Sequence, residues 1–248
     1  MLCGPSAALI DADIIFFYYI CMIMLKKLFM CMVTGVALGI ALPVHAAAQA
    51  IQTASEFFKS VSDYYATIQD YTADVDITAD KSHMQGKVSF KRPEMLRMDF
   101  SDPAEQTILF NGDTLIIYLP GSSAILEQNI SHSGAVSATP TGLSLMQRYY
   151  NIAYETGQTP VPLEEGNSEL VVNLILRRRV ASEAFSHIKV SVSPETKLIR
   201  RIIATTPANV SFTFYFANYN LNTNLSDQRF LYDPPSSANT YNNFLFSE

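Results

Sequence analysis

A repeated alternation of apolar and polar residues constrains the fold more than any other feature of this sequence. Side chains of a β-strand point alternately to two faces, so a period of two predicts a half-buried strand. The alternating segments are separated by turn residues, and Asn111-Gly112 between two apolar runs is a strong hairpin signal. The expected strands are 71–79, 86–91, 96–100, 107–110, 114–119, 124–129, 170–176, 187–192, 198–205 and 210–219. About ten strands in antiparallel succession predict a mainly β domain.

Two segments have helical periodicity instead. Apolar residues recur at helical spacing over 51–69, with charged residues between them, and predict an amphipathic helix that opens the domain. A second helix is expected over 141–154, within a connection over 131–166 that is rich in Ser, Gly and Pro at its edges. Such a helix often forms a lid or a binding element, and a helix that closes one end of the core explains the pattern equally well. No internal repeat or linker is present, so we expect one domain over 47–248.

The N-terminal residues have the pattern of a secretory signal peptide. Two lysines precede an uncharged run over 28–42, and Val44 and Ala46 occupy positions −3 and −1 of a cut after Ala46. The run spans about 22 Å as a helix, less than a hydrocarbon core of about 30 Å, which favours cleavage over a retained anchor. We therefore expect a signal peptide over 24–46. Residues 1–23 are interpreted as an extension that precedes the true start codon. The alternative is a membrane hairpin.

Composition and charge narrow the function. A formal net charge of −6 over 248 residues leaves no basic field for phosphates, so no nucleic-acid partner is expected. A hydrophobic content of 48% with 16% charged residues indicates a chain that can bury a core. The three cysteines, Cys3, Cys21 and Cys31, all precede the expected cut. The exported chain would therefore have neither a disulfide nor a lipidated cysteine, and we expect a soluble periplasmic protein held by its core.

Residue patterns typical of enzymes and metal sites are not recognisable. The histidines after the expected cut lack metal-ligand spacing, and Ser144 lacks the second glycine of a nucleophile elbow. We accordingly expect no enzymatic activity, no metal and no cofactor. The densest basic runs, 177–179 and 200–201, are interpreted as charges at strand ends, with a docking patch as the alternative.

Arg92 interrupts an apolar face. Val88 and Phe90 define the buried face of the strand 86–91, and Arg92 is the next residue of the same parity. A guanidinium at the rim of an apolar surface needs hydrogen-bond acceptors or water. Arg92 is either a rim arginine that extends to solvent or a latch that holds backbone carbonyls of a movable element over the apolar concavity.

Four stretches occur together in an order typical of one protein family. They are 86–98, 102–103, 110–120 and 225–235, and they include Lys-Arg-Pro, Asp-Pro, Asn-Gly-Asp and a closing Phe-x-x-x-Pro-Pro. Each is weak alone, and together they are fairly specific. In this order and spacing the chain resembles the LolA-type family of periplasmic outer-membrane lipoprotein carriers.

The resemblance implies an incomplete, open antiparallel β-barrel with an N-terminal helix and a helical lid over an apolar cavity. It implies a monomeric chaperone that receives lipoprotein acyl chains from an inner-membrane ABC lipoprotein-releasing transporter. An outer-membrane acceptor lipoprotein or the membrane itself would take them up. Arg92 matches the family's lid-fastening arginine, and Leu96 matches a large apolar cavity residue. The expected cavity residues are Val88, Phe90, Leu96, Met98 and Phe100, and the lid residues expected from the pattern are Leu143, Met146, Tyr149 and Tyr150.

The sequence also departs from the family. The family commonly carries Trp in these strands, and this chain has none, Met98 standing where one is expected. Residues 120–166 match poorly. A periplasmic lipid-binding or lipoprotein-sensing protein of the same fold therefore remains an alternative, because fold alone does not define function. An outer-membrane β-barrel is a less favoured alternative, since a helix opens the domain.

Overall fold

The computed structural model describes residues 52–80, 82–129, 142–233 and 235–242. The expected signal peptide over 24–46 and the interpreted extension over 1–23 lie outside the described residues, as do residues 131–141 of the connection that was expected to contain a lid.

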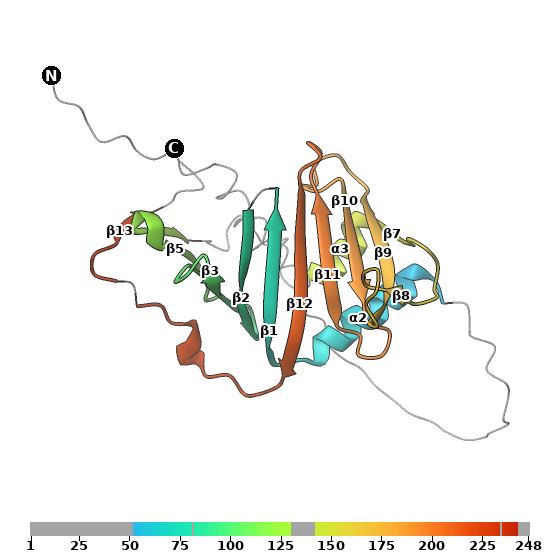
Figure 1. The fold of residues 1–248 in the computed structure, drawn as a ribbon, viewed down its shortest axis with the longest axis horizontal. Coiled ribbons are helices and arrows are strands. Elements are labelled where there is room, and N and C mark those ends of the chain that lie inside the picture. The colour runs from blue at the N-terminus through green and yellow to red at the C-terminus, as the bar shows by residue number, and fades with distance from the viewer. Residues whose placement is uncertain (1–51, 81, 130–141, 234, 243–248) are drawn as a thin grey trace.

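The described strands form one open sheet (Figure 1). Their order is β13-β6-β5-β4-β3-β2-β1-β12-β11-β10-β9-β7, and β8 pairs with β9 off this path. The strands are β1 (Asp70–Ala79), β2 (Ser82–Lys91), β3 (Met95–Asp102), β4 (Thr107–Phe110), β5 (Thr114–Leu119), β6 (Ala124–Asn129), β7 (Tyr150–Tyr154), β8 (Val161–Pro162), β9 (Leu170–Arg178), β10 (His187–Val192), β11 (Ile199–Thr205), β12 (Ser211–Leu221) and β13 (Asn239–Asn242). Because β13 and β7 are the two ends of the order, the sheet does not close into a barrel.

The ten strands expected from the alternation are all present, and three further strands join them. The predicted helix over 141–154 is wrong in its second half: α3 (Gly142–Tyr149) ends there, and β7 follows at once. Ile152 and Tyr154 favour extended backbone, and pairing of β7 with β9 satisfies its polar groups. The prediction of antiparallel strands does not hold for every pair either, because β13 pairs with β6 in parallel.

Helix α2 (Ala54–Thr67) begins at a capping box. The Thr53 hydroxyl accepts from the Glu56 amide, and the Glu56 carboxylate accepts from the Thr53 amide at 2.8 Å. The Glu56 carboxylate also accepts from the Thr53 hydroxyl, and the bonds from the Thr53 amide and hydroxyl lower the pKa of Glu56, the amide bond having the larger effect. Phe57, Phe58, Val61 and Tyr65 are buried on one face of the helix. The helix thus forms for local reasons and is kept in place by that face.

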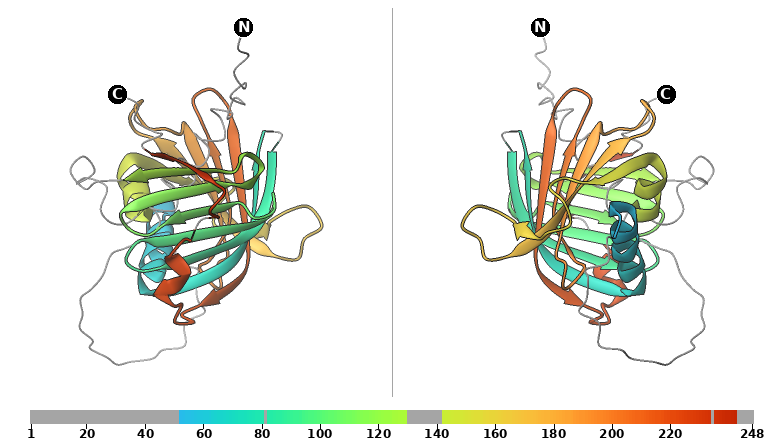
Figure 2. Two further views of the ribbon diagram at one scale, coloured as in Figure 1. Left: turned by 90° about the vertical axis from the view of Figure 1, so that its left-hand side faces the viewer. Right: turned by 90° about the vertical axis from the view of Figure 1, so that its right-hand side faces the viewer.

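The sheet bends so that β3–β6 and β9–β12 run across one another, with both helices on one side between them (Figure 2). Gly86 lies where the register of β2 against β3 shifts. A Cβ at this position would lie 2.3 Å from the Asp99 carbonyl oxygen, so only glycine permits this approach of the two strands. The inner face of the bent sheet and the helices share one hydrophobic core.

After β12, residues 222–233 and 235–242 cross the outer face of the first half of the sheet and end at its edge in β13 (Figures 1 and 2). We call these residues the C-terminal strap. It includes the short 3-10 helix η2 (Asp227–Phe230), whose Phe230 is 1% exposed. The ring of Tyr232 packs against that of Tyr118, with centroids 6.1 Å apart. The strap therefore covers the face opposite the helices.

Candidate functional site

The five residues expected to line an apolar cavity lie together on the inner face of β2 and β3. Val88 pairs with Met98, Phe90 with Leu96, and Gly86 with Phe100 across the two strands. All five side chains are buried in the main hydrophobic core, together with residues of α2 and of the second half of the sheet. The sequence parity thus assigned them to the correct face, and in this conformation side chains fill the space over them.

The residues expected to form a lid divide between two elements. Leu143 and Met146 are buried on α3, and Tyr149 is partly buried in its last turn. Tyr150 is not a helix residue, because it begins β7. Its buried hydroxyl donates to the Phe185 carbonyl at 3.4 Å, and burial raises its pKa to about 12. Among the described residues of 142–154, those of α3 alone can therefore form the helical cover expected from this segment.

Arg92 contacts the C-terminal end of α2. Its Nε donates to the Ile68 carbonyl at 2.8 Å, and its Nη2 donates to the Ala66 carbonyl. The Arg92 amide also donates to the Gln69 carbonyl at 3.0 Å. The last carbonyls of a helix have no partner within the helix and carry partial negative charge, which suits a guanidinium. Partial burial lowers the pKa of Arg92, but the guanidinium stays charged.

This geometry differs from the expectation in one respect. Arg92 holds backbone carbonyls of a helix that covers the apolar inner face, as a latch would, but these carbonyls belong to α2 and not to α3. The two helices are coupled, because they pack together and the side-chain amide of Gln147 donates to the Ser55 carbonyl at 3.4 Å. Displacing α2 would therefore also disturb α3.

A cluster of tyrosines at the C-terminal end of α2, formed by Tyr65, Tyr71 and Tyr219, was not anticipated. The Tyr65 hydroxyl accepts from the Ile199 amide at 3.0 Å, and the Tyr219 hydroxyl donates to the Ile199 carbonyl at 2.9 Å. Tyr71 stacks on Phe90, with centroids 5.5 Å apart. Burial raises the pKa of Tyr65 to about 12 and raises that of Tyr219 strongly. Helical spacing predicted the inward face for Tyr65, and strand parity predicted it for Tyr71. Tyr219 has the opposite parity to the buried phenylalanines of β12, and its hydrogen bond to β11 has no sequence signal.

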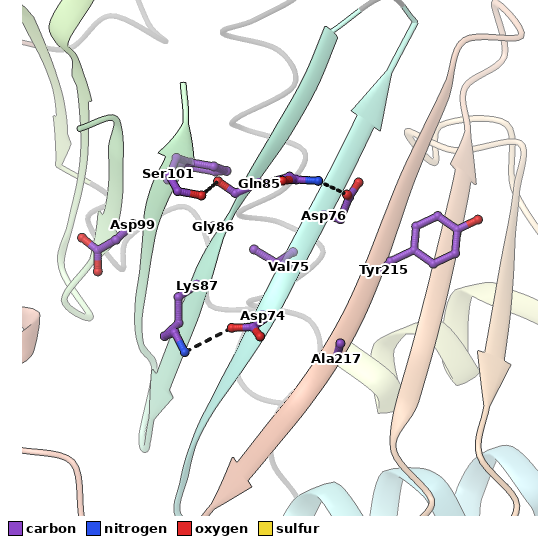
Figure 3. A pocket seen from close by; sticks show the side chains of 11 residues that line it. Asp74, Val75, Asp76, Gln85, Gly86, Lys87, Asp99, Ser101, Tyr215 and Ala217 are labelled. Carbon is purple, nitrogen blue, oxygen red and sulfur yellow. Dashed lines mark hydrogen bonds and ion pairs between the residues drawn. The ribbon is translucent and has the colours of Figure 1, made fainter. Parts of the chain in front are cut away.

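A groove of about 570 Å³ lies on the outer face, over β1, β2, β3 and β12 (Figure 3). Its charged groups are already paired: Lys87 Nζ lies 3.1 Å from Asp74, and the Gln85 side chain donates to Asp76 at 2.8 Å. A hydrogen bond from Asn218, and then Lys87, lower the pKa of Asp74. Charged side chains that are paired with one another line this groove, so we do not assign it to an acyl chain. Within the described residues, no group of three or more His, Cys, Asp or Glu could hold a metal ion.

The fold and the inner face define a class of protein: a single open β-sheet bent around an apolar interior that helices cover. The family model "Outer membrane lipoprotein carrier protein LolA" matches residues 76–233, more than half of the chain. The chain therefore belongs to the LolA family, as the motifs of 86–98 and 225–235 predicted. No curated protein matches the sequence.

The chain is similar to several solved structures. A conserved protein of Thermus thermophilus is 13% identical, with a TM-score of 0.50 over 74% of this chain and 98% of that one. A LolA superfamily protein from Nitrosomonas europaea is 13% identical, with a TM-score of 0.37 over 73% of this chain and 98% of that one. In the Pseudomonas aeruginosa MucA/MucB complex, the matching chain is 11% identical, with a TM-score of 0.45 over 75% of this chain and 62% of that one.

Among the helices of the described residues, none combines the length and the apolar character that a membrane span requires. Membership of the LolA family indicates a location in the cell envelope.

Proposed function

We propose that this protein is a periplasmic carrier that shields the acyl chains of lipoproteins and moves them from the inner to the outer membrane. The observation that carries the proposal is the position of Arg92. Its guanidinium holds the C-terminal carbonyls of α2 over the apolar inner face of β2 and β3. The helix is thus fastened at its end by a few polar contacts, directly above the apolar surface.

The inner face is the surface that suits acyl chains. Phe90, Leu96 and Met98 lie on adjacent strands and present a continuous apolar area to the helices. Each methylene group removed from water contributes about 0.8 kcal/mol, so a lipid with several chains would bind too tightly to be released if the site were empty and open. A carrier therefore needs a competing closed state.

The closed state is supplied by the protein's own side chains. Leu143 and Met146 of α3 and the apolar face of α2 occupy the inner face when no lipid is bound. Opening would break the contacts of Arg92 with Ala66 and Ile68 and expose these side chains. The free energy of opening would offset part of the gain from lipid burial and permit transfer.

The remaining parts of the proposal concern location and partners. We propose that residues 24–46 are a cleaved signal peptide, so that the domain from residue 47 acts as a monomer in the periplasm. An inner-membrane ABC transporter that releases lipoproteins would load it, and an outer-membrane acceptor lipoprotein or the membrane would unload it. The role is non-enzymatic and needs no cofactor.

The test is to express the whole chain with its own N-terminal segment, purify the periplasmic form and identify copurifying molecules by mass spectrometry. Lipoproteins in stoichiometric amount, lost on incubation with outer membranes, are expected. Copurification of free phospholipid alone would instead favour a lipid-binding or lipoprotein-sensing protein of the same fold. Recovery only from the membrane pellet would contradict a periplasmic carrier.

A further inference from the structure

Three exposed arginines lie at the end of α3 and at the end of β9, and the backbones of these two segments are hydrogen bonded to each other. Arg148 is in the last turn of α3, and Arg177 and Arg179 lie at the end of β9 and immediately after it. The register of β7 against β9 pairs Asn151 with Arg177, and the Arg179 amide donates to the Tyr149 carbonyl at 2.9 Å. We call Arg148, Arg177 and Arg179 the arginine patch.

The patch is a local excess of positive charge on an acidic protein. Among the ion pairs of the described residues, none includes a member of the patch, whereas Arg97, Arg200 and Arg229 each pair with a carboxylate. The negative charge of Glu183 is nearby, since it raises the pKa of Tyr150, and it offsets only part of the excess. The pKa of His187 is lowered by burial and then by the positive charges of Arg177 and Lys189.

Two aliphatic side chains protrude next to the patch. Val180 follows it directly in the β9–β10 hairpin and is 50% exposed, and Val210 in the β11–β12 turn is 42% exposed. The two hairpins are neighbours, because the Ser186 amide donates to the Thr205 carbonyl at 2.8 Å. The corresponding ends of β9–β12 lie at the same end of the sheet (Figure 1). Arg178 shapes the first hairpin by donating to the Ala181 carbonyl at 3.0 Å.

We propose that the arginine patch and these two hairpin tips dock the protein on the anionic surface of a lipid membrane. Arginine binds phosphate groups with two parallel hydrogen bonds, and its charge attracts an anionic bilayer. Aliphatic residues beside basic ones suit the boundary between headgroups and acyl chains. Val180 and Val210 stand at protruding tips rather than in a concave pocket, which fits a broad surface better than an acidic peptide.

Docking at this end would place α3 next to the membrane. If the protein carries acyl chains, the covering helices would then open close to the bilayer, and this use rests on the proposed function. The docking itself does not, because it is measured on protein without cargo. Failure of vesicle binding would therefore leave the carrier proposal standing, and absence of bound lipoproteins would leave the docking surface standing.

The experiment compares binding of the purified protein to vesicles of phosphatidylcholine alone and of phosphatidylcholine mixed with phosphatidylglycerol, by flotation. The test variant is R177Q/R179Q, and the matched control is K59Q/K87Q, which removes the same charge from exposed sites elsewhere. Binding only to the anionic vesicles is expected, weakened by added salt. Each lost arginine should weaken binding about fivefold. The affinity of the test variant for anionic vesicles should therefore fall about 25-fold, and that of the control should change little.

A second variant separates the apolar contribution from charge. Val180→Ser keeps the charge and should still weaken binding, and Arg148→Gln should weaken it as either of the other arginines does. Circular dichroism melting identifies any variant that fails to fold. If the double variant R177Q/R179Q does not fold, the two single variants decide whether the patch binds the membrane. Equal loss in both double variants, equal binding to both kinds of vesicle, or no vesicle binding would overturn the proposal. Binding to polyglutamate without binding to vesicles would overturn it in favour of an acidic protein partner.

Discussion

The two faces of β2 and β3 are covered in different ways. On the inner face, α2 and α3 lie over apolar side chains, and Arg92 fastens the end of α2 through backbone carbonyls. On the outer face, polar side-chain contacts hold the C-terminal strap. Arg229 donates to the Ser89 hydroxyl at 2.7 Å and to Asp99 at 3.1 Å, and Arg97 donates to the Arg229 carbonyl at 3.0 Å.

The start of the strap is equally well anchored. The Asp70 carboxylate, which is buried, accepts from the Thr223 amide at 2.8 Å and from the Asn224 amide at 3.0 Å. Networks of this kind fix one geometry, because each partner would be left unsatisfied if the others moved. Apolar helix packing is not directional and can be replaced by another apolar partner. The strap is therefore held in one geometry as a permanent cover, and under the proposed function the helices are the cover that opens.

Phe230→Ala tests the permanent cover and should have the largest effect on stability. Phe230 belongs to the strap and its side chain is buried, so loss of its ring should lower the free energy of unfolding by about 3–5 kcal/mol. Urea denaturation measures the change. The neighbouring Leu231 is 68% exposed, so Leu231→Ala should alter stability by only about 0.5 kcal/mol. Similar losses in the two variants would show that the strap is not packed as a cover.

Arg92→Leu tests the removable cover. Loss of the hydrogen bonds to Ala66 and Ile68 should destabilise the closed state by about 2 kcal/mol, or roughly thirtyfold in the equilibrium between closed and open forms. The variant should retain bound acyl chains longer and donate them poorly, as measured by the rate of lipoprotein transfer to acceptor membranes.

The control for this prediction is the same substitution on the opposite face. Arg229→Leu removes an arginine bound to Ser89 and Asp99, so it should lower stability without slowing transfer. Normal transfer by Arg92→Leu, or equal slowing in both variants, would refute a latch at Arg92.

Tyr65→Phe tests the aromatic cluster under the end of α2. It leaves the buried Ile199 amide without its acceptor and should cost about 1–2 kcal/mol. The pKa of Tyr65 is raised from 10.0 to about 12, so its contribution is complete below pH 10 and is lost as pH rises to about 12.

Stability of the wild-type protein should therefore fall above pH 10, and Tyr65→Phe should reduce this fall by about 1.4 kcal/mol per pH unit. Thermal melting as a function of pH measures it. Tyr64→Phe is the control at the adjacent, partly buried position. An unchanged alkaline slope in Tyr65→Phe would contradict the assignment.

The smallest effect is expected on the solvent side of α2. Lys59 and Asp63 form an exposed ion pair at 2.7 Å, one helical turn apart. Lys59→Gln should change the free energy of unfolding by less than about 0.5 kcal/mol and leave the rate of lipoprotein transfer unchanged. A larger loss would mean that surface charge, and not the buried face and Arg92, keeps α2 in place.

Much of the fold could be predicted because its signals are local. Strands such as β4, β5, β6 and β10 have the predicted bounds, since alternation is imposed by the pleat of the strand itself. The same parity assigned Phe90, Leu96 and Met98 to the inner face before their partners were known. Four short motifs, none of them specific alone, also sufficed to predict the LolA family.

The strands that were missed have no such local signal. Residues 150–154 continue the apolar pattern of α3, and they are extended because β9 offers them an edge. Asn239–Asn242 is exposed throughout, and the parallel pairing with β6 follows from the path of the strap. In both segments pairing with a distant strand, and not a pattern in the sequence, decided the structure.

The sequence by itself determined the strand alternation, the inner face, the opening helix and the family. Only the tertiary structure decided that Arg92 contacts α2 and that the strap covers the outer face. A strand's parity depends on neighbouring residues, whereas the carbonyls at the end of a helix become acceptors for a distant arginine only after both elements pack on the same sheet.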